Sequence, residues 1–191
     1  MMEIVDLLGF SPMIFLHSYG GGGILSGFLH PLLGLDHLLA MLSVGILSAQ
    51  IGGRALWTVP ATFVATMAVG ALLGTAGFAL PLVEYGITFS VLILGIAILF
   101  GNSIPEWAAL IAVAIFALFH GNAHGTEIPE ITNTIGLLVA YILGFLIATA
   151  GLHVVGALIG IMVGRLKRGQ MLMRLGGLAI ALAGVFLILN I

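Results

Sequence analysis

Two histidines and a glutamate recur at helical spacing in the second half of the chain, and this pattern suits a divalent metal ion. His120 and His124 are four residues apart, and Glu127 follows seven residues after His120. Residues at these spacings share one face of an α-helix. Imidazole nitrogens and carboxylate oxygens are ligands that Ni²⁺, Co²⁺, Cu²⁺ and Zn²⁺ accept. Gly121 and Gly125 lie beside this face and predict that a second helix approaches closely.

A second group of the same residue types lies nearer the N-terminus. His30 is followed by Pro31, and Asp36 directly precedes His37. Because proline is favoured in the first turn of a helix, Pro31 predicts that a helix begins at His30. His30 and His37 would then share a face two turns apart, and Asp36 would either bind a cation or orient an imidazole. Met41, one turn beyond His37, is an accessory candidate.

The remaining histidines stand apart from these groups. His17 precedes a run of glycines and is either a solvated loop residue or an accessory ligand. His153 lies within a long apolar run. A histidine in such a run more usually forms a hydrogen bond between helices, and the alternative is that it acts as a metal ligand or relay. The chain contains no cysteine, which excludes disulfides and thiolate metal sites.

The elements that must position these residues are membrane helices. Of the 191 residues, 61% are hydrophobic and 6% are charged, and the mean hydropathy is +1.30. Soluble domains carry about 25% charged residues, so the composition excludes an ordinary cytosolic protein. Disorder requires low hydrophobicity, and nucleic-acid binding requires a basic patch, so both are excluded as well. We therefore expect an integral membrane protein whose partners include the lipid bilayer and no nucleic acid.

Long runs without charged residues divide the chain into spans, since a helix needs about 20 apolar residues to cross a bilayer. The predicted fold is an all-α bundle of six transmembrane helices that forms a single domain over residues 28–191. Residues 1–27 are interpreted as an N-terminal lead-in that is ordered or partly re-entrant, and a seventh span in this segment is the alternative. The spans are predicted at residues 28–51, 55–79, 83–101, 106–126, 133–163 and 172–190.

Charge predicts how this bundle is oriented. Every basic residue falls in or beside the connection after the first span or the connection after the fifth span. The positive-inside rule therefore places these connections in the cytoplasm and the N-terminus outside. Both histidine groups then lie in the outer halves of their spans, at one depth. We expect a single metal site near the outer face of a bacterial-type inner membrane. The basic residues are Arg54, Arg165, Lys167, Arg168 and Arg174.

The sequence resembles the HupE/UreJ family of membrane proteins in three stretches. They run from Ser26 to Pro31, from Gly34 to Met41 with Val44 and Gly45 following, and from Phe119 to Gly125 with Glu127 following. The resemblance implies uptake of nickel, or in some members cobalt, for the maturation of hydrogenase and urease. It also implies a set of metal-handling residues, namely His30, Asp36, His37, His120, His124 and Glu127.

These observations predict a secondary transporter, a permease that carries divalent transition-metal cations from the outer side to the cytoplasm. Nickel is the first choice and cobalt the second, with copper and zinc as further alternatives. The metal is the substrate, and no prosthetic group and no enzyme activity are expected. The chain has no G-x-x-x-x-G-K-[ST] motif for ATP, so entry would use the membrane potential, protons or a partner. Assembly into a homo-oligomer is left open.

Two other classes of function use the same residues. The first is an intramembrane zinc-dependent hydrolase in which Glu127 or Asp36 acts as the general base. The second is a sensor or accessory subunit that binds the metal without conducting it. Tight retention of metal through purification would favour either of these, and weak exchangeable binding would favour transport.

Overall fold

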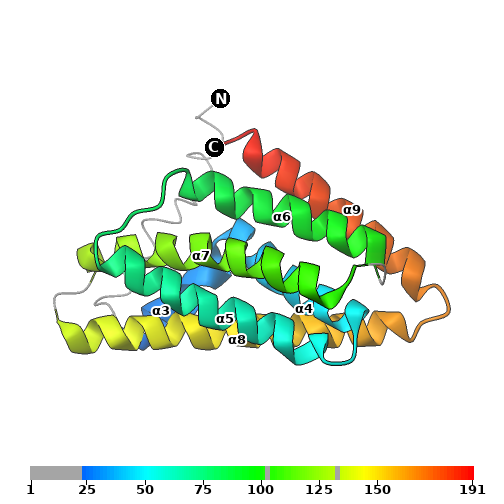
Figure 1. Cartoon of the computed structure of the whole chain (residues 1–191), viewed down its shortest axis with the longest axis horizontal. Coiled ribbons are helices and arrows are strands. Elements are labelled where there is room, and N and C mark those ends of the chain that lie inside the picture. The colour runs from blue at the N-terminus through cyan, green and yellow to red at the C-terminus, as the bar shows by residue number, and fades with distance from the viewer. Residues whose placement is uncertain (1–22, 102–103, 132–133) are drawn as a thin grey trace, which may run out of the picture.

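The computed structural model describes residues 23–101, 104–131 and 134–191, apart from the side chains of residues 127–131, and all regular structure in these ranges is helical (Figure 1). The predicted all-α fold is therefore confirmed. Most of the predicted lead-in, with His17, lies outside the described residues. The helices are α3 (Ile24–Leu33), α4 (Leu35–Ile51), α5 (Ala55–Thr75), α6 (Val83–Phe100), α7 (Glu106–Ile131), α8 (Ile135–Gly164) and α9 (Gly169–Ile188).

Seven described helices stand where six spans were predicted, because the first predicted span is divided between α3 and α4. The helices α5 to α9 are each long and apolar enough to cross a membrane, and α3 with α4 makes a sixth candidate if this bent pair is one span. Large apolar side chains are exposed along these helices, as lipid-facing surfaces require. Trp57 and Trp107 are both exposed near the starts of α5 and α7, where an aromatic belt would meet the membrane surface.

The first predicted span is not one continuous helix in the structure, because the helix is interrupted at Gly34. The axes of α3 and α4 differ by 86° at Gly34, whose backbone is extended, with φ −83° and ψ 116°. The predicted helix start at His30 is wrong, since α3 begins at Ile24 and carries Pro31 in its last turn. The break instead follows Pro31 by three residues, and Asp36 accepts the backbone N–H of His37 at 2.7 Å in the first turn of α4.

Glycines allow the helices to approach at backbone distance. A Cβ atom on Gly121 would collide with the carbonyl group of Met67, and one on Gly125 would collide with that of Ala71. Both contacts join α7 to α5, which confirms the close approach predicted from these two glycines. Further glycines of this kind join α3 to α8, α4 to α8 and α6 to α9, namely Gly27, Gly144, Gly45, Gly156, Gly95 and Gly177.

The basic residues gather at one end of the bundle. The connections that follow α4, α6 and α8 lie at the same end of the molecule (Figure 1). The connections that follow α4 and α8 contain Arg54, Arg165, Lys167 and Arg168, and Arg174 lies in the first two turns of α9. We call this end the basic end. Helix α4 ends toward this end, and the last turns of α7 lie at the opposite end of the molecule (Figure 1).

Candidate metal site

Helices α3 and α4 bring two of the predicted histidines together by way of the break at Gly34. His30 lies in the last turn of α3 and His37 in the first turn of α4. Their ring centroids are 6.4 Å apart. The two side chains therefore meet across a helix break, whereas the sequence predicted that they share one face of a continuous helix.

Helix α7 adds the other two predicted histidines to the same place. The centroid of the His124 ring lies 4.6 Å from that of His30 and 4.8 Å from that of His37. The centroid of His120 lies 5.0 Å from that of His37. Residues separated by about ninety positions thus form one group, which we call the histidine cluster: His30, His37, His120 and His124.

The spacing of the rings matches that of imidazoles on a shared ion. Because a metal–imidazole nitrogen bond is about 2.0–2.1 Å long, two rings bound to one ion have centroids about 4.5–5 Å apart. The three shortest separations in the histidine cluster fall in this range. As they stand, however, no three described His, Cys, Asp or Glu side chains form a group that could hold a metal ion. Binding therefore requires the rings to rotate, and the coordination sphere is not preassembled.

Hydrogen bonds fix the rings of His37 and His120 through Nδ1 and leave Nε2 of each ring available. The Nδ1–H of His37 donates to Asp36 Oδ1 at 2.9 Å, and the Nδ1–H of His120 donates to the carbonyl oxygen of Phe116 at 2.9 Å. Each bond fixes the tautomer, so that Nε2 carries a lone pair. Asp36 thus orients an imidazole, which is one of the two roles predicted for it.

The free nitrogens of the histidine cluster are buried. Nε2 of His37, Nε2 of His120 and both ring nitrogens of His124 have no hydrogen-bond partner among the described residues. Each such buried group costs about 1–3 kcal/mol while it lacks a partner. A cation that accepts one lone pair from each of the three rings would remove much of that cost. The donor set therefore fits a transition-metal ion as substrate.

The histidine cluster is fully buried at α7 and partly exposed at α3 and α4. His120 and His124 are 0% and 1% exposed, whereas the side chains of His37 and Asp36 are 12% and 21% exposed. An ion that enters from this side would therefore meet the partly exposed side chains of α3 and α4 before the buried rings of α7. The negative charge of Asp36 at this edge favours the approach of a cation.

Aromatic rings form the apolar walls of the site. Phe145 of α8 stacks on His124 with the ring centroids 4.9 Å apart. Phe63 of α5 meets the ring of His120 at 5.5 Å, and Tyr141 of α8 lies 6.0 Å from His30. The sequence analysis did not identify these residues, because an aromatic residue in an apolar run has no distinctive spacing.

Asn122 is a further residue whose role was not predicted. Its Nδ2 donates to the carbonyl oxygen of Phe78 at 2.7 Å, and its Oδ1 accepts the N–H of Leu80 at 2.8 Å. The side chain therefore ties the connection between α5 and α6 to α7, next to His120 and His124. The sequence signal for this role was an amide side chain between the two histidines, since an amide can bond to a backbone N–H and a backbone carbonyl group at the same time.

The other predicted residues either lie outside the histidine cluster or are not among the described residues. Met41 is fully buried in α4. His153 of α8 contacts Phe63 and does not join the four rings. The side chain of Glu127 and the whole of His17 lie outside the described residues.

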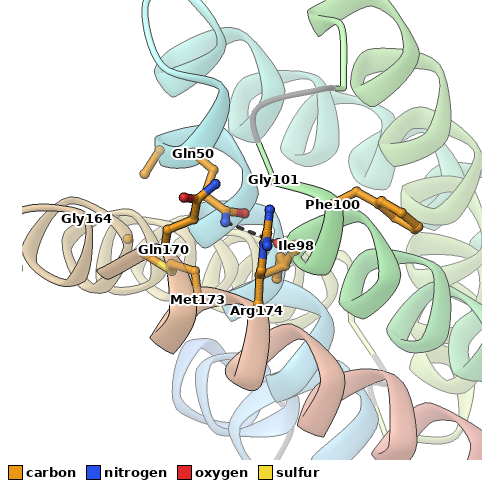
Figure 2. A pocket seen from close by; sticks show the side chains of 10 residues that line it. Gln50, Ile98, Phe100, Gly101, Gly164, Gln170, Met173 and Arg174 are labelled. Atoms are coloured by element: carbon orange, nitrogen blue, oxygen red, sulfur yellow. Dashed lines mark hydrogen bonds between the residues drawn. The ribbon is translucent and has the colours of Figure 1, made fainter. Parts of the chain in front are cut away.

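A pocket of about 340 Å³ lies apart from the histidine cluster, at the basic end (Figure 2). It is lined by residues of α4, α6, α8 and α9, together with Gly101. Gln50 Nε2 donates to the carbonyl oxygen of Ile98 at 3.2 Å, and Gln50 Oε1 has no partner among the described residues. In Figure 2, Gln170 and Arg174 project from α9 toward Gln50 and Gly101.

Comparisons with known proteins agree with the resemblance noted from the motifs. A family model described as "HupE / UreJ protein" matches residues 5–187. The chain is 47% identical over 169 residues to "Protein HupE" of Rhizobium leguminosarum bv. viciae, covering 88% of this chain and 85% of the relative. No solved structure matches the chain. The family match spans the histidine cluster and six of the seven described helices in full, so this chain belongs to the HupE/UreJ family.

Proposed function

We propose that the protein is a permease for divalent transition-metal cations, with nickel as the first substrate and cobalt as the second. One observation carries this proposal, namely the unpartnered ring nitrogens of His37, His120 and His124 buried together in a helical membrane protein. Ionisable groups inside a membrane are costly and are usually functional. Here the ring of His37 on α4 lies 5.0 Å from that of His120 and 4.8 Å from that of His124 on α7, so a rotation of the rings could bring these nitrogens onto one cation.

The chemistry of the donors supports a borderline cation. Imidazoles suit Ni²⁺, Co²⁺, Cu²⁺ and Zn²⁺, and the absence of cysteine argues against a trap for soft ions. A transport site must also release its ion, so binding must be moderate. Rings that have to rotate before they bind are consistent with moderate and exchangeable binding.

The direction of transport follows from the distribution of charge. The histidine cluster lies toward the end of the bundle opposite the basic end. The positive-inside rule assigns the basic end to the cytoplasm of a bacterial-type inner membrane, so the cluster would receive metal from outside. An inside-negative potential favours the entry of a divalent cation by about 4.6 kcal/mol per 100 mV.

Nickel uptake into proteoliposomes under an inside-negative potential tests the proposal. We expect uptake by the unmodified protein and a loss of at least about tenfold in His37→Ala and His124→Ala, since each change removes a ligand. Ser90→Ala is the matched control, because the buried Ser90 hydroxyl donates to the carbonyl oxygen of Ile87 in its own helix. It should transport like the unmodified protein.

Binding of metal without transport would instead indicate one of the other two classes of function, a hydrolase or a sensor. If the unmodified protein retains stoichiometric metal through purification and takes up none, it is no permease. That outcome would favour the hydrolase or the sensor, and both histidine variants should then lack the retained metal. Release of a dye from a peptide or ester substrate would separate the hydrolase from the sensor.

A further inference from the structure

A second buried polar group lies on α8, outside the histidine cluster. His153 is 1% exposed, and neither of its ring nitrogens has a hydrogen-bond partner among the described residues. Thr149, one turn earlier on the same face, is also buried. A fully buried imidazole without partners is a costly feature in the interior of a membrane protein. Packing alone would be served as well by a phenyl ring.

Helix α5 places the thioether of Met67 and the ring of Phe63 against this group. The hydroxyl of Thr149 donates to Met67 Sδ at 3.9 Å, which is a weak bond because a thioether is a poor acceptor. The ring of Phe63, one turn before Met67, meets the ring of His153 edge to face at 5.1 Å. The two contacts are one helical turn apart on both helices. They bring an imidazole, a hydroxyl and a thioether together between α5 and α8.

Phe63 also links this group to the histidine cluster. Its ring contacts His120 at a centroid distance of 5.5 Å and His153 at 5.1 Å. A single phenyl ring therefore connects the deepest part of the histidine cluster with the polar group on α8. This ring is a carbon surface that a hydrated cation would not cross unless Phe63 moved.

The polar group on α8 is nearer the basic end than the histidine cluster is. Gly45 of α4 packs against the backbone of His153, and Gly45 follows His37 by eight residues, which is about 12 Å along a helix. Gly160 and Gly164, which follow His153 on α8, line the pocket at the basic end (Figure 2). His153 therefore lies at a depth between the histidine cluster and this pocket.

From this placement we infer that His153, Thr149 and Met67 form a second, inner binding station for the cation. The inference rests on the proposed function and extends it to the inner half of the path. The ion would leave His120 when Phe63 moves aside and would bind His153 before it reaches the basic end. Nitrogen, oxygen and sulfur donors in one small group suit the same borderline cations as the histidine cluster.

Equilibrium dialysis of the detergent-solubilised full chain against Co²⁺ tests the inner station directly. We expect the unmodified protein to bind two equivalents, a tighter and a weaker one. His153→Phe, which keeps a ring against Phe63, should lose the weaker equivalent and keep the tighter one. Ser90→Ala should bind both. If the unmodified protein binds a single equivalent, or if His153→Phe still binds two with unchanged affinities, the inner station is refuted.

Proteoliposome uptake of nickel provides the second readout. His153→Phe should transport at least about tenfold more slowly than the unmodified protein, because a transport path needs each of its sites. Transport at the unmodified rate would overturn the inference. If the unmodified protein transports nothing, the permease proposal fails, and dialysis still decides whether His153 binds metal.

A second variant guards against a purely structural effect. His153→Gln keeps a polar group of similar length, and size-exclusion chromatography reports whether each variant stays folded and monodisperse. We expect His153→Gln to retain part of the weaker equivalent. Loss of both equivalents in two monodisperse His153 variants would show that His153 supports the histidine cluster structurally, and this result would contradict an inner station.

Discussion

At the scale of single residues, the histidine cluster depends on the groups that hold its rings as well as on the rings themselves. Asp36 and the carbonyl group of Phe116 each accept an Nδ1–H, which leaves Nε2 of His37 and of His120 directed to the interior. The sequence predicted the four histidines from their spacing. It left open whether Asp36 binds the metal or orients a histidine ring, because this depends on the rotamer of the His37 side chain.

The first prediction concerns Asp36. Asp36→Asn keeps the shape of the side chain but removes the charge, so His37 loses its strongest acceptor. We expect metal affinity to fall about 10–100-fold, as for other carboxylates that orient a ligating histidine. Dialysis against Ni²⁺, with thermal unfolding in detergent as the folding control, measures this effect. An unchanged affinity would mean that the Asp36 carboxylate does not tune the site.

The second prediction concerns Asn122, which holds the connection between α5 and α6 through Phe78 and Leu80. Asn122→Ala should lower the free energy of unfolding by about 1–3 kcal/mol, because two backbone groups lose their partner. Thermal or denaturant unfolding in detergent would measure it. Thr126→Ala is a suitable comparison, because the Thr126 hydroxyl donates to the carbonyl oxygen of Ala123 in its own helix. Equal stability of the two variants would argue against this role.

At the scale of elements, hydropathy predicted nearly all of the helices. The uncharged runs gave α5 to α9 with ends within a few residues, since apolar length is what a membrane helix requires. The break between α3 and α4 was missed because residues 28–51 are long and apolar enough for one span, and a single glycine such as Gly34 does not by itself end a membrane helix. Pro31 was taken as a helix start, whereas the chain turns three residues later, and this turn brings His30 back to His37.

The third prediction tests the packing that places α7 beside α5. Gly121→Ala puts a methyl group into the backbone of Met67 at a position between His120 and His124 on α7, so a shift of α7 that relieves the collision would also move these two histidines. We expect a loss of stability of about 1–3 kcal/mol together with weaker metal binding. Gly151→Ala on α8 is the matched control, because a Cβ atom there meets nothing within 4 Å. It should be neutral or slightly stabilising, since alanine is the better helix former.

At the scale of the whole molecule, the basic residues and the histidine cluster lie at different positions along the helical bundle. The histidine cluster lies toward one end, the pocket with Arg174 and Gln50 lies at the basic end, and His153 lies between them. Charge counting predicted that the two histidine groups share a depth, and the structure brings them into contact. The polar group between α5 and α8 could not be predicted, because Thr149 and Met67 carry no charge and Met67 meets Thr149 only through the packing of α5 on α8.

The fourth prediction concerns orientation. Because the chain has no cysteine, single cysteines can report which side of the membrane each end faces. Leu166 lies exposed in the connection between α8 and α9, and Ala79 lies exposed in the connection between α5 and α6. A membrane-impermeant thiol reagent applied to intact spheroplasts should label Ala79→Cys and should label Leu166→Cys only after permeabilisation. The reverse pattern would place the basic end outside, and the histidine cluster would then face the cytoplasm. That result would contradict the role of the histidine cluster as the first site that metal from outside reaches.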